Sequence, residues 1–246
     1  MEPGEALSRL QALGFSERDA AVLAEHFLEA DRRGKPSHGA VRIGWLETWD
    51  DLRPDARPER VVAEPGFERW DGRGALGYLT LAAICDAQLA APPQRSRLVV
   101  AADAWPVGAL GHWVRTLAEG GLVALLTATS PRRLASPSGG PPLAGTTPLA
   151  VGIPSSDGPP LVADVSFARA THGHVLLGEA EESDVVPFGG DHAHKAFALA
   201  VGLQALVDAL TGGDAYGAVL LVARPEGNPI PGLRDLAAGV HLPGDR

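Results

Sequence analysis

The feature that most constrains the fold of this chain is an alternation of helical and strand-like segments between residues 75 and 128. Residues 75–90, ALGYLTLAAICDAQLA, are dense in apolar side chains and contain no proline, which is typical of a helix. The following segments predict a strand at 97–102, a helix at 109–119 and a strand at 122–128. This alternation favours an α/β or α+β fold.

The flanking segments add a helical N-terminal region and further strands. Residues 5–33 are predicted to be helical, with Ser16 as an N-cap inside the segment and Gly34 closing it. A second helix is predicted from Ser37 to about Asp50, and residues 51–68, rich in Pro, Arg and Glu, are predicted to form a loop. The sequence also predicts strands at 148–153, 160–165 and 218–223 and a long apolar helix at 193–210.

Length, charge and cysteine usage narrow the class of protein. The 246 residues suffice for a helical region over 1–60 packed as one unit with an α/β core over 61–246. A net charge of -9 argues against a nucleic-acid partner. No uninterrupted apolar run reaches the roughly 18 to 20 residues of a membrane-spanning helix, and no signal peptide precedes the first helix, so no membrane partner is expected. The single cysteine, Cys85, favours a reducing cytoplasm.

One glycine-rich segment superficially resembles a dinucleotide-binding fingerprint. Residues 72–77, GRGALG, match G-x-G-x-x-G, precede a predicted helix, and are followed by a strand ending at Asp103. The fingerprint also requires a buried, β-branched strand before the glycines, but the preceding residues EPGFERWD are short and charged. We therefore interpret the segment as a glycine-rich turn before a helix.

The stretch GKPSHGAVRIGW, residues 34–45, places Ser37, His38 and Arg42 within six positions. Ser37 alone is explained by helix capping, since its hydroxyl can accept a hydrogen bond from an unpaired backbone N–H. His38 is less easily explained, because the positive helix terminus disfavours its charged form. A histidine that gives a proton, beside a guanidinium that grips a carboxylate, suits reduction at a carbon next to a carboxylate.

Two short runs of histidines and several tryptophans offer other hypotheses. The runs THGHV (171–175) and DHAH (191–194) would form a zinc or iron site only if they converged in space; solvated loop histidines are the simpler interpretation, and no metal is predicted. Cys85 is expected to be buried and inert. Trp105 and Trp113 flank the glycine-rich turn and are expected to form core or a pocket wall, with stacking on a ligand ring as the alternative.

Several segments together resemble the type-2 malate/L-lactate dehydrogenase family, which includes ureidoglycolate and sulfolactate dehydrogenases and reductases of cyclic imino acids. The matching segments occur in the family's order and cover most of the chain: ADRRGKPSHGAVR, GALGHWVRTLAEGGLVAL, GGPPLAGTTPLAVGIPSSDGPPLVADVS, VPFGGDHAHKAFALA and HLPGDR. The resemblance implies a non-Rossmann fold with a mixed central sheet, a nicotinamide cofactor (NADH or NADPH) and a homodimer with sites near the subunit interface.

The resemblance also assigns roles to individual residues. His38 would be the proton donor, with Ser37 in its relay, and Arg42 would hold the carboxylate of a small-molecule substrate. Thr146 would lie beside the substrate. The cofactor would be lined by Gly108, Asp164, Val165, Ser166, His194 and Lys195.

Some positions depart from the family pattern. Pro106 stands where the family commonly has a histidine, Thr147 replaces the Asn of G-T-N-P, and His174 replaces a relay acid. The chain is also about a hundred residues shorter than the resemblance leads one to expect. The expected activity is NAD(P)H-dependent reduction of a C=O or C=N bond adjacent to a carboxylate, on a 2-oxo acid or cyclic imino acid. Two alternatives stay open: a non-redox lyase, isomerase or cyclase on the same scaffold, and an inactive binding partner.

Overall fold

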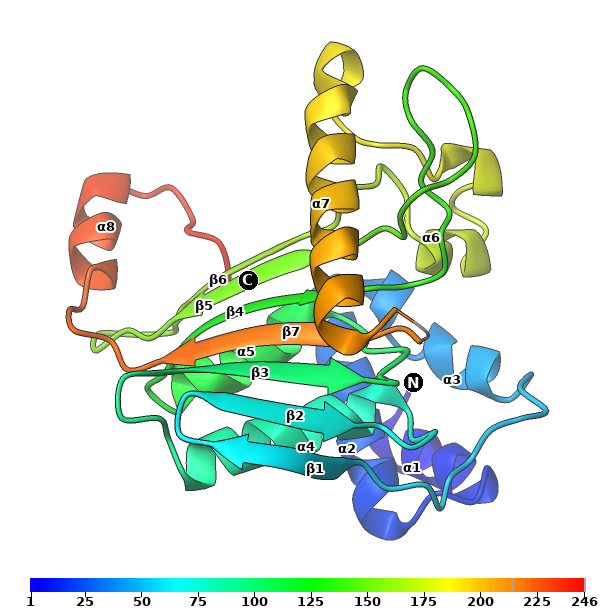
Figure 1. Cartoon of the computed structure of the whole chain (residues 1–246), viewed down its shortest axis with the longest axis horizontal. Helices are drawn as coiled ribbons and strands as arrows, with labels where there is room; N and C mark the ends of the chain where they lie inside the picture. The colour runs from blue at the N-terminus through cyan, green and yellow to red at the C-terminus, as the bar shows by residue number, and fades with distance from the viewer. Residues whose placement is uncertain (214, 246) are drawn as a thin grey trace.

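The computed structural model describes residues 1–213 and 215–245, which contain a seven-stranded sheet. Its strands are β1 (Glu59–Glu64), β2 (Phe67–Asp71), β3 (Ser96–Ala102), β4 (Val123–Ala128), β5 (Leu149–Ile153), β6 (Leu161–Val165) and β7 (Ala218–Ala223). The strand order is β1-β2-β3-β7-β4-β5-β6 (Figure 1). In the described part of the chain β2 and β3 are parallel, and the other five neighbouring pairs are antiparallel. The predicted α/β class with a mixed sheet is confirmed.

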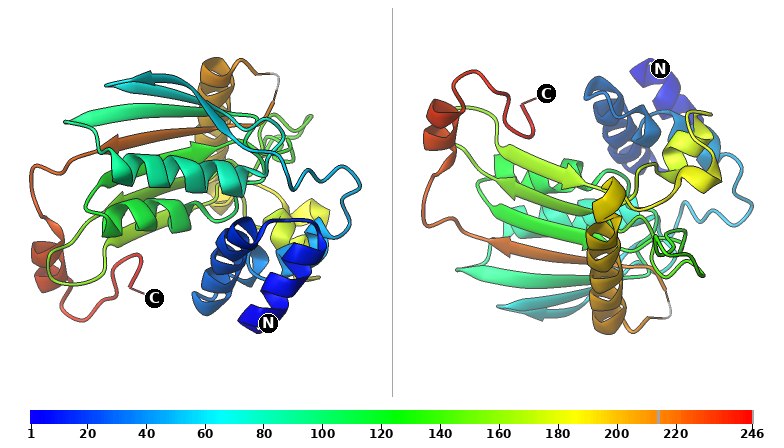
Figure 2. Two further views of the ribbon diagram at one scale, coloured as in Figure 1. Left: turned by 90° about the horizontal axis from the view of Figure 1, so that it is seen from below. Right: turned by 90° about the horizontal axis from the view of Figure 1, so that it is seen from above.

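Helices cover the two faces of the sheet unequally (Figure 2). The helices α4 (Gly77–Ala90) and α5 (Leu110–Glu119) lie along one face, while α7 (Ala193–Thr211) crosses the other. The remaining helices are α1 (Pro3–Ala12), α2 (Glu17–Arg32), α3 (Val41–Leu46), α6 (His172–Leu176) and α8 (Ile230–Ala237), with 3₁₀ turns η1 (Pro36–His38), η2 (Glu182–Asp184) and η3 (Gly190–His192).

The main hydrophobic core lies between α4, α5 and the sheet and continues into the N-terminal helices. Leu23 and Phe27 of α2 pack in the same cluster as Leu81 of α4 and Leu117 of α5. A smaller cluster, which includes Phe167 and Ala200, lies beneath α7. The N-terminal region thereby shares a core with the sheet and holds the segment that follows α2 close to it.

The helix α7 stands out from the rest of the molecule. By length and composition alone, the segment Gly190–Thr211 would suffice to cross a membrane, with a mean hydropathy of 1.3. The segment carries Asp191, Lys195 and Asp208, and one side of α7 packs against β3, β4 and β7. Much of its outer surface is nevertheless exposed, including Leu199 at 54%.

Three predicted elements differ from the structure. The predicted helix over 5–33 is broken between α1 and α2 at Gly14, whose φ of +94° is incompatible with a continuous helix. Ser16 does cap α2, since its Oγ accepts a hydrogen bond from the Asp19 N–H at 3.2 Å. The helix predicted from Ser37 to Asp50 is instead the turn η1 followed by the short α3, so Ser37 is not an N-cap.

The predicted loop over 51–68 is also wrong, because residues 59–71 form the hairpin of β1 and β2. The strand β2 was not predicted because Glu68, a charged residue, occupies one of its inward-facing positions. Its carboxylate accepts hydrogen bonds from Trp70 Nε1 at 3.0 Å and Gln88 Nε2 at 2.8 Å, and Arg60 lies 3.2 Å away. A buried carboxylate with this many partners is tolerated in a strand that otherwise alternates regularly.

A strand therefore does precede GRGALG, and β2, α4 and β3 form a parallel β-α-β unit. The space beside Gly72 and Gly77 is nevertheless filled by the chain's own backbone. A Cβ on Gly72 would lie 1.8 Å from the Asp103 carbonyl oxygen, and one on Gly77 would lie 2.7 Å from the Trp105 nitrogen. The interpretation of this segment as a structural turn is confirmed, since its close approach is to residues 103–106.

Candidate active site

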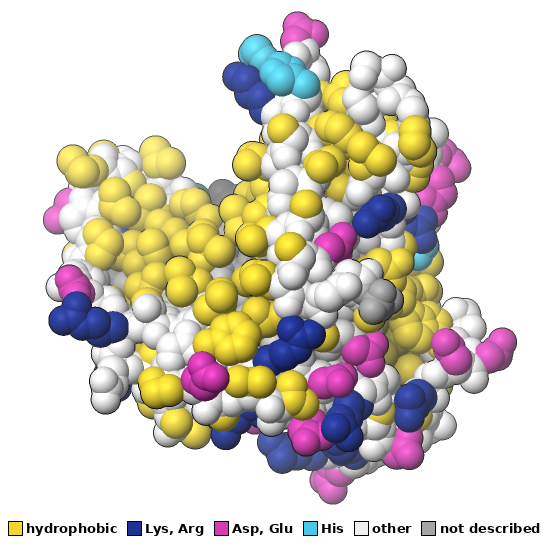
Figure 3. Space-filling model, viewed as in Figure 1, with side chains coloured by type: hydrophobic (Ala, Val, Ile, Leu, Met, Phe, Trp, Pro, Cys, Tyr) yellow, Lys and Arg dark blue, Asp and Glu magenta, His cyan; other side chains and the backbone are white. Residues whose placement is uncertain are grey.

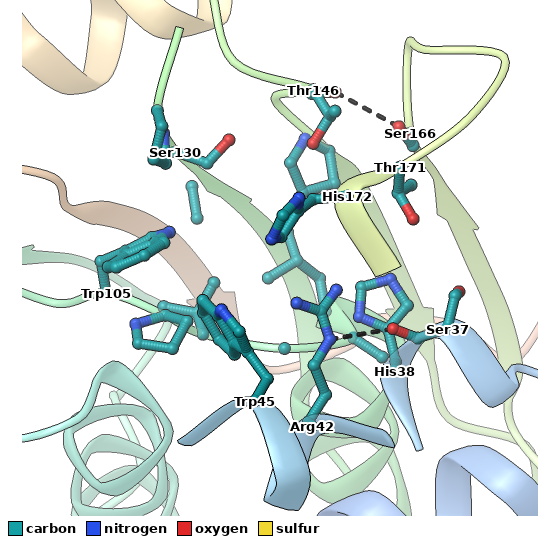
Figure 4. A pocket seen from close by; sticks show the side chains of 18 of the residues that line it. Ser37, His38, Arg42, Trp45, Trp105, Ser130, Thr146, Ser166, Thr171 and His172 are labelled. Atoms are coloured by element: carbon teal, nitrogen blue, oxygen red, sulfur yellow. Dashed lines mark hydrogen bonds between the residues drawn. The ribbon is translucent and has the colours of Figure 1, made fainter. Parts of the chain in front are cut away.

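A cavity of about 1070 Å³ opens where η1, α3, the start of α5 and the ends of β4 and β6 meet (Figure 4). Most of the residues singled out from the sequence border it: Ser37, His38, Arg42, Gly108, Thr146, Asp164 and Ser166. Val165 borders a neighbouring cavity of about 320 Å³. His194 and Lys195 border neither cavity and lie exposed at the start of α7.

The turn η1 and helix α3 are fixed to each other and to α2. Asp31 near the end of α2 accepts a hydrogen bond from the Ala40 N–H at 3.0 Å, and Arg42 Nε donates to the Ser37 carbonyl at 2.9 Å. The helix α6 packs directly on this turn, because a Cβ on Gly173 would lie 2.0 Å from the Ser37 carbonyl oxygen. Ser37, His38 and Arg42 are thus held by short-range contacts rather than by one continuous helix.

Arg42 is a buried cation without an acidic partner. Its exposure is 7%, and no carboxylate among residues 1–213 and 215–245 lies within 4.0 Å of its guanidinium. Its Cζ lies 5.1 Å above the Trp45 ring, and burial lowers its pKa. A guanidinium held in this state has its remaining donors available for an anion.

His38 is a half-buried, neutral histidine. Burial and the nearby Arg42 lower the pKa of His38 to about 3, while Asp164 acts in the opposite direction. Its Nδ1 is buried and has no hydrogen-bond partner among the described residues. At neutral pH the imidazole of the free protein is therefore uncharged.

His174, at the position of the relay acid, is used for local structure. Its Nδ1 accepts a hydrogen bond from the Thr171 N–H at 3.1 Å, and its ring caps α6. Among the described residues the nearby carboxylate that favours the charged form of His38 is Asp164, in β6. Asp164 Oδ2 pairs with Lys35 Nζ at 2.9 Å and accepts from the Gly111 N–H at 3.0 Å. A side chain at 111 would displace the Asp164 carboxylate, since an added Cβ would lie 2.9 Å from Asp164 Oδ2.

The residues around Thr146 and Ser166 form the opposite side of the cavity. Ser166 Oγ donates to the Thr146 carbonyl at 3.4 Å, which joins the 145–148 loop to the end of β6 (Figure 4). Thr147 is fully buried, and its hydroxyl donates to the Gly145 carbonyl at 3.2 Å. The Thr147 side chain thus supports the loop, whereas Thr146 faces the cavity.

The smaller cavity adjoins the larger one at Lys35, Ala109 and Asp164. It is bordered by Arg33 and Arg115, both close to Glu29. Burial raises the pKa of Glu29, but hydrogen bonds from His112 and Arg33 outweigh this and lower the pKa to about 2. With Lys35 and the start of α5, this cavity presents a mixed but cation-rich lining.

The sequence reasoning missed some residues of the larger cavity. Lys35 has no role that the sequence predicts, because its partner Asp164 is 129 positions away. Trp45, Trp49 and His172 also border the cavity. The spacing of the two tryptophans, four residues apart in WLETW, was an available signal. Trp113 is 2% exposed and belongs to the core, where its Nε1 donates to the Val107 carbonyl at 2.8 Å.

The two histidine runs do not converge. His172 and His174 border the larger cavity, whereas His192 and His194 lie at η3 and the start of α7. No group of three or more His, Cys, Asp or Glu suited to a metal ion occurs among the residues that the structure describes. Arg246, the last residue of HLPGDR, lies outside the described residues, but Pro243 and Gly244 of that motif border the smaller cavity.

Comparison with known proteins gives a consistent result. Residues 5–185 match the malate/L-lactate dehydrogenase family. A Δ1-pyrroline-2-carboxylate/Δ1-piperideine-2-carboxylate reductase of Pseudomonas putida is 31% identical over 244 residues, covering 85% of this chain and 70% of the relative. A (2R)-3-sulfolactate dehydrogenase (NADP⁺) of Chromohalobacter salexigens is 28% identical over 193 residues, covering 75% of this chain and 56% of the relative.

Solved structures show the same fold. The Δ1-piperideine-2-carboxylate reductase of Pseudomonas syringae pv. tomato superposes with a TM-score of 0.85 at 25% identity, covering 99% of this chain and 89% of that one. A malate dehydrogenase of Pyrococcus horikoshii superposes with a TM-score of 0.78 at 22% identity, covering 96% and 78%.

Proposed function

The chain belongs to the malate/L-lactate dehydrogenase family, and from that premise we propose that it reduces a C=O or C=N bond next to a carboxylate, or catalyses the reverse oxidation, with NADH or NADPH. The substrates named for its relatives, an imino acid, sulfolactate and diketogulonate, support this class of substrate. The observation that carries the proposal is the buried Arg42 without an acidic partner. A substrate carboxylate supplies that partner.

Binding of the carboxylate also prepares the proton donor. Arg42 is one of the causes that depress the pKa of His38. A carboxylate paired with Arg42 cancels that effect, so the pKa of His38 rises in the complex and protonation of the imidazole becomes more favourable. We propose that His38 gives this proton to the developing oxyanion or amine, and that the adjacent buried Ser37 relays a proton to it. Thr146 lies across the cavity, where it would contact the substrate.

The lining of the two cavities fits a nicotinamide cofactor. The larger cavity has space for a substrate and a planar ring, and the smaller one offers Arg33, Arg115 and the start of α5 to anionic groups. We propose that Gly108, Asp164 and Ser166 border the ring and that Val165 borders the remainder. When bound, the cofactor supplies or accepts the hydride. Pro106 offers no side-chain hydrogen bond there, so orientation depends on the other residues.

We further propose that the protein is a homodimer of the cytoplasm. His194 and Lys195 are exposed on α7, away from the cavities of their own chain, so they would contact a cofactor only across an interface. The exposed apolar residues of α7 support such an interface. Cys85 is buried and free, which suits a reducing compartment.

The proposal is tested by titrating the protein with NADH and NADPH and following nucleotide fluorescence, then the oxidation of the bound form with a panel of 2-oxo and cyclic imino acids. His38→Ala should abolish turnover while leaving nucleotide affinity nearly unchanged. Arg42→Lys should raise KM for the acid by roughly 10- to 100-fold, because the bidentate contact is lost. Failure to bind either nucleotide would overturn the proposal and leave the non-redox alternatives.

A further inference from the structure

Three tryptophans form one side of the larger cavity, and we call them the indole wall. Trp45 comes from α3, Trp49 follows that helix, and Trp105 lies between β3 and α5. The rings of Trp49 and Trp105 are stacked with centroids 5.3 Å apart, and Trp45 meets both edge-on at 4.8 and 5.7 Å. Segments distant in the sequence therefore build one continuous aromatic surface.

The indole wall is not part of the closed core. All three rings are only half-buried, and all three border the cavity, whereas Trp70 and Trp113 are 7% and 2% exposed. Aromatic rings left open toward a cavity gain free energy when another apolar or planar group covers them. The surface thus remains incompletely desolvated until a ligand occupies it.

The indole wall lies next to Arg42, the residue that would hold the carboxylate. Arg42 Cζ lies 5.1 Å over the Trp45 ring, and Figure 4 shows Trp45 and Trp105 on the side of Arg42 away from Ser37. Asp164 and Ser166, assigned above to the cofactor, belong to β6 and the segment that follows it. An acid anchored at Arg42 with its reacting carbon toward His38 therefore has its side chain free to lie along the wall.

We propose that the substrate is a 2-oxo or 2-imino acid bearing a planar aromatic group, such as an aryl-pyruvate, rather than a small aliphatic acid. This inference rests on the proposed function for the site and its anchor, Arg42. The indole wall provides the complementary surface for the ring, and a methyl-bearing acid such as pyruvate would leave that surface in water. The cavity of about 1070 Å³ has room for the larger side chain beside a nicotinamide ring.

Binding is measured first with acids that cannot be reduced, so that the result does not depend on turnover. With either nucleotide present, 3-phenylpropionate and propionate are titrated while tryptophan fluorescence is followed. We expect 3-phenylpropionate to bind on the order of 50-fold more tightly. Trp49→Ala should reduce this preference severalfold, Trp49→Phe should largely restore it, and Trp70→Phe, a change in β2 away from the cavity, should leave it intact.

Turnover then separates this inference from the proposed function. We expect kcat/KM for phenylpyruvate and indole-3-pyruvate to exceed that for pyruvate by a similar factor. Equal binding of the two propionates, or reduction of pyruvate as efficiently as phenylpyruvate, would overturn the substrate inference while the reductase stands. A Trp49→Ala variant that keeps the full preference, or that loses nucleotide affinity instead, would assign the wall to another role and also overturn it. Tight binding of 3-phenylpropionate without oxidation of the nucleotide by any acid would overturn the proposed reductase alone.

Discussion

At the scale of single residues, the site is built from groups that are unfavourable without a ligand. Arg42 is buried without a carboxylate, and the Nδ1 of His38 is buried without a hydrogen bond among the described residues. Each lowers the stability of the free protein. One bound carboxylate would relieve both, because it pairs with Arg42 and lowers the free-energy cost of protonating His38.

This coupling predicts that binding of a carboxylate takes up a proton. Burial and Arg42 hold the pKa of His38 at about 3 in the free protein, so the imidazole is neutral at about pH 5.5; a carboxylate on Arg42 removes the second of these causes and raises the pKa. Calorimetric titration with an unreactive carboxylate in buffers of different ionisation enthalpy should show net proton uptake at about pH 5.5. His38→Asn should bind without that uptake; the same uptake in the variant would assign the proton to another group.

The same depressed pKa values predict acid sensitivity. Burial lowers the pKa of His26, His38 and His172 below the ordinary 6.5, so the unfolded chain binds more protons than the folded one once the pH falls below about 6.5. Stability is therefore fully present above about pH 6.5 and is lost as the pH falls toward 3. Urea unfolding at about pH 7.5 and 5 should show a smaller loss for His38→Asn, whereas His241→Asn, at an exposed histidine, should behave like the parent.

The residues near Arg42 show what the sequence could and could not reveal. Ser37, His38 and Arg42 lie within six positions, so local spacing was enough to predict that they lie together, and all three border the larger cavity. The family and the class of enzyme are also confirmed. Lys35 with Asp164, and Trp105 with Trp49, meet only through folding across many positions. Pairings of that kind depend on the register of the sheet, which a single sequence does not specify.

At the scale of elements, β2 illustrates why one strand escaped prediction. The inward position of Glu68 breaks the apolar alternation, yet the side chain is satisfied by four partners, with Arg97 completing the set at 3.4 Å. A prediction based on apolar residues alone therefore interprets β2 as a charged loop. The side chains of other elements that pair with Glu68 come from β1, α4 and β3.

We predict that Glu68→Ala lowers the free energy of unfolding by roughly 3 kcal/mol, because Arg97 and Gln88 lose a buried anionic partner. Glu68→Gln, which keeps the shape, should cost less. Both losses are measured by urea unfolding. Since Glu68 does not border either cavity, nucleotide affinity of the folded protein should not change; a matching loss of affinity would contradict the separation of β2 from the site.

The packing of α6 on η1 gives a second prediction at this scale. A Cβ on Gly173 would lie 2.0 Å from the Ser37 carbonyl oxygen and 2.7 Å from Arg42 Nη2, so Gly173→Ala must displace α6 or the turn. We expect kcat/KM to fall by at least roughly 10-fold while the protein remains folded by circular dichroism. Gly4→Ala, in α1, is the matched control, since nothing lies within 4 Å of its added Cβ. Equal activity of the two variants would contradict the role of this contact.

At the scale of the whole molecule, the two faces of the sheet are covered unequally. A single chain leaves apolar side chains of one face exposed to solvent. One face is covered by α4 and α5, whereas the face crossed by α7 leaves the paired residues Leu125 and Leu221 exposed at 38% and 43%. Figure 3 shows a broad hydrophobic area on this face beside α7. A surface of this kind is typical of a subunit interface.

The proposed homodimer is therefore tested at this face. Leu199 and Leu206 of α7 are exposed at 54% and 45%, and the double change to Glu would place two charges in the interface. Light scattering after gel filtration should give the mass of two chains for the parent and of one chain for the double variant. The variant should also lose nucleotide affinity if His194 and Lys195 act across the interface.

The control is Val61→Glu, on the edge strand β1 at 44% exposure, which should remain dimeric. A monomeric parent that binds nucleotide normally would show that the site is complete within one chain, whereas recovery of the parent only with detergent would indicate that lipid covers α7 instead.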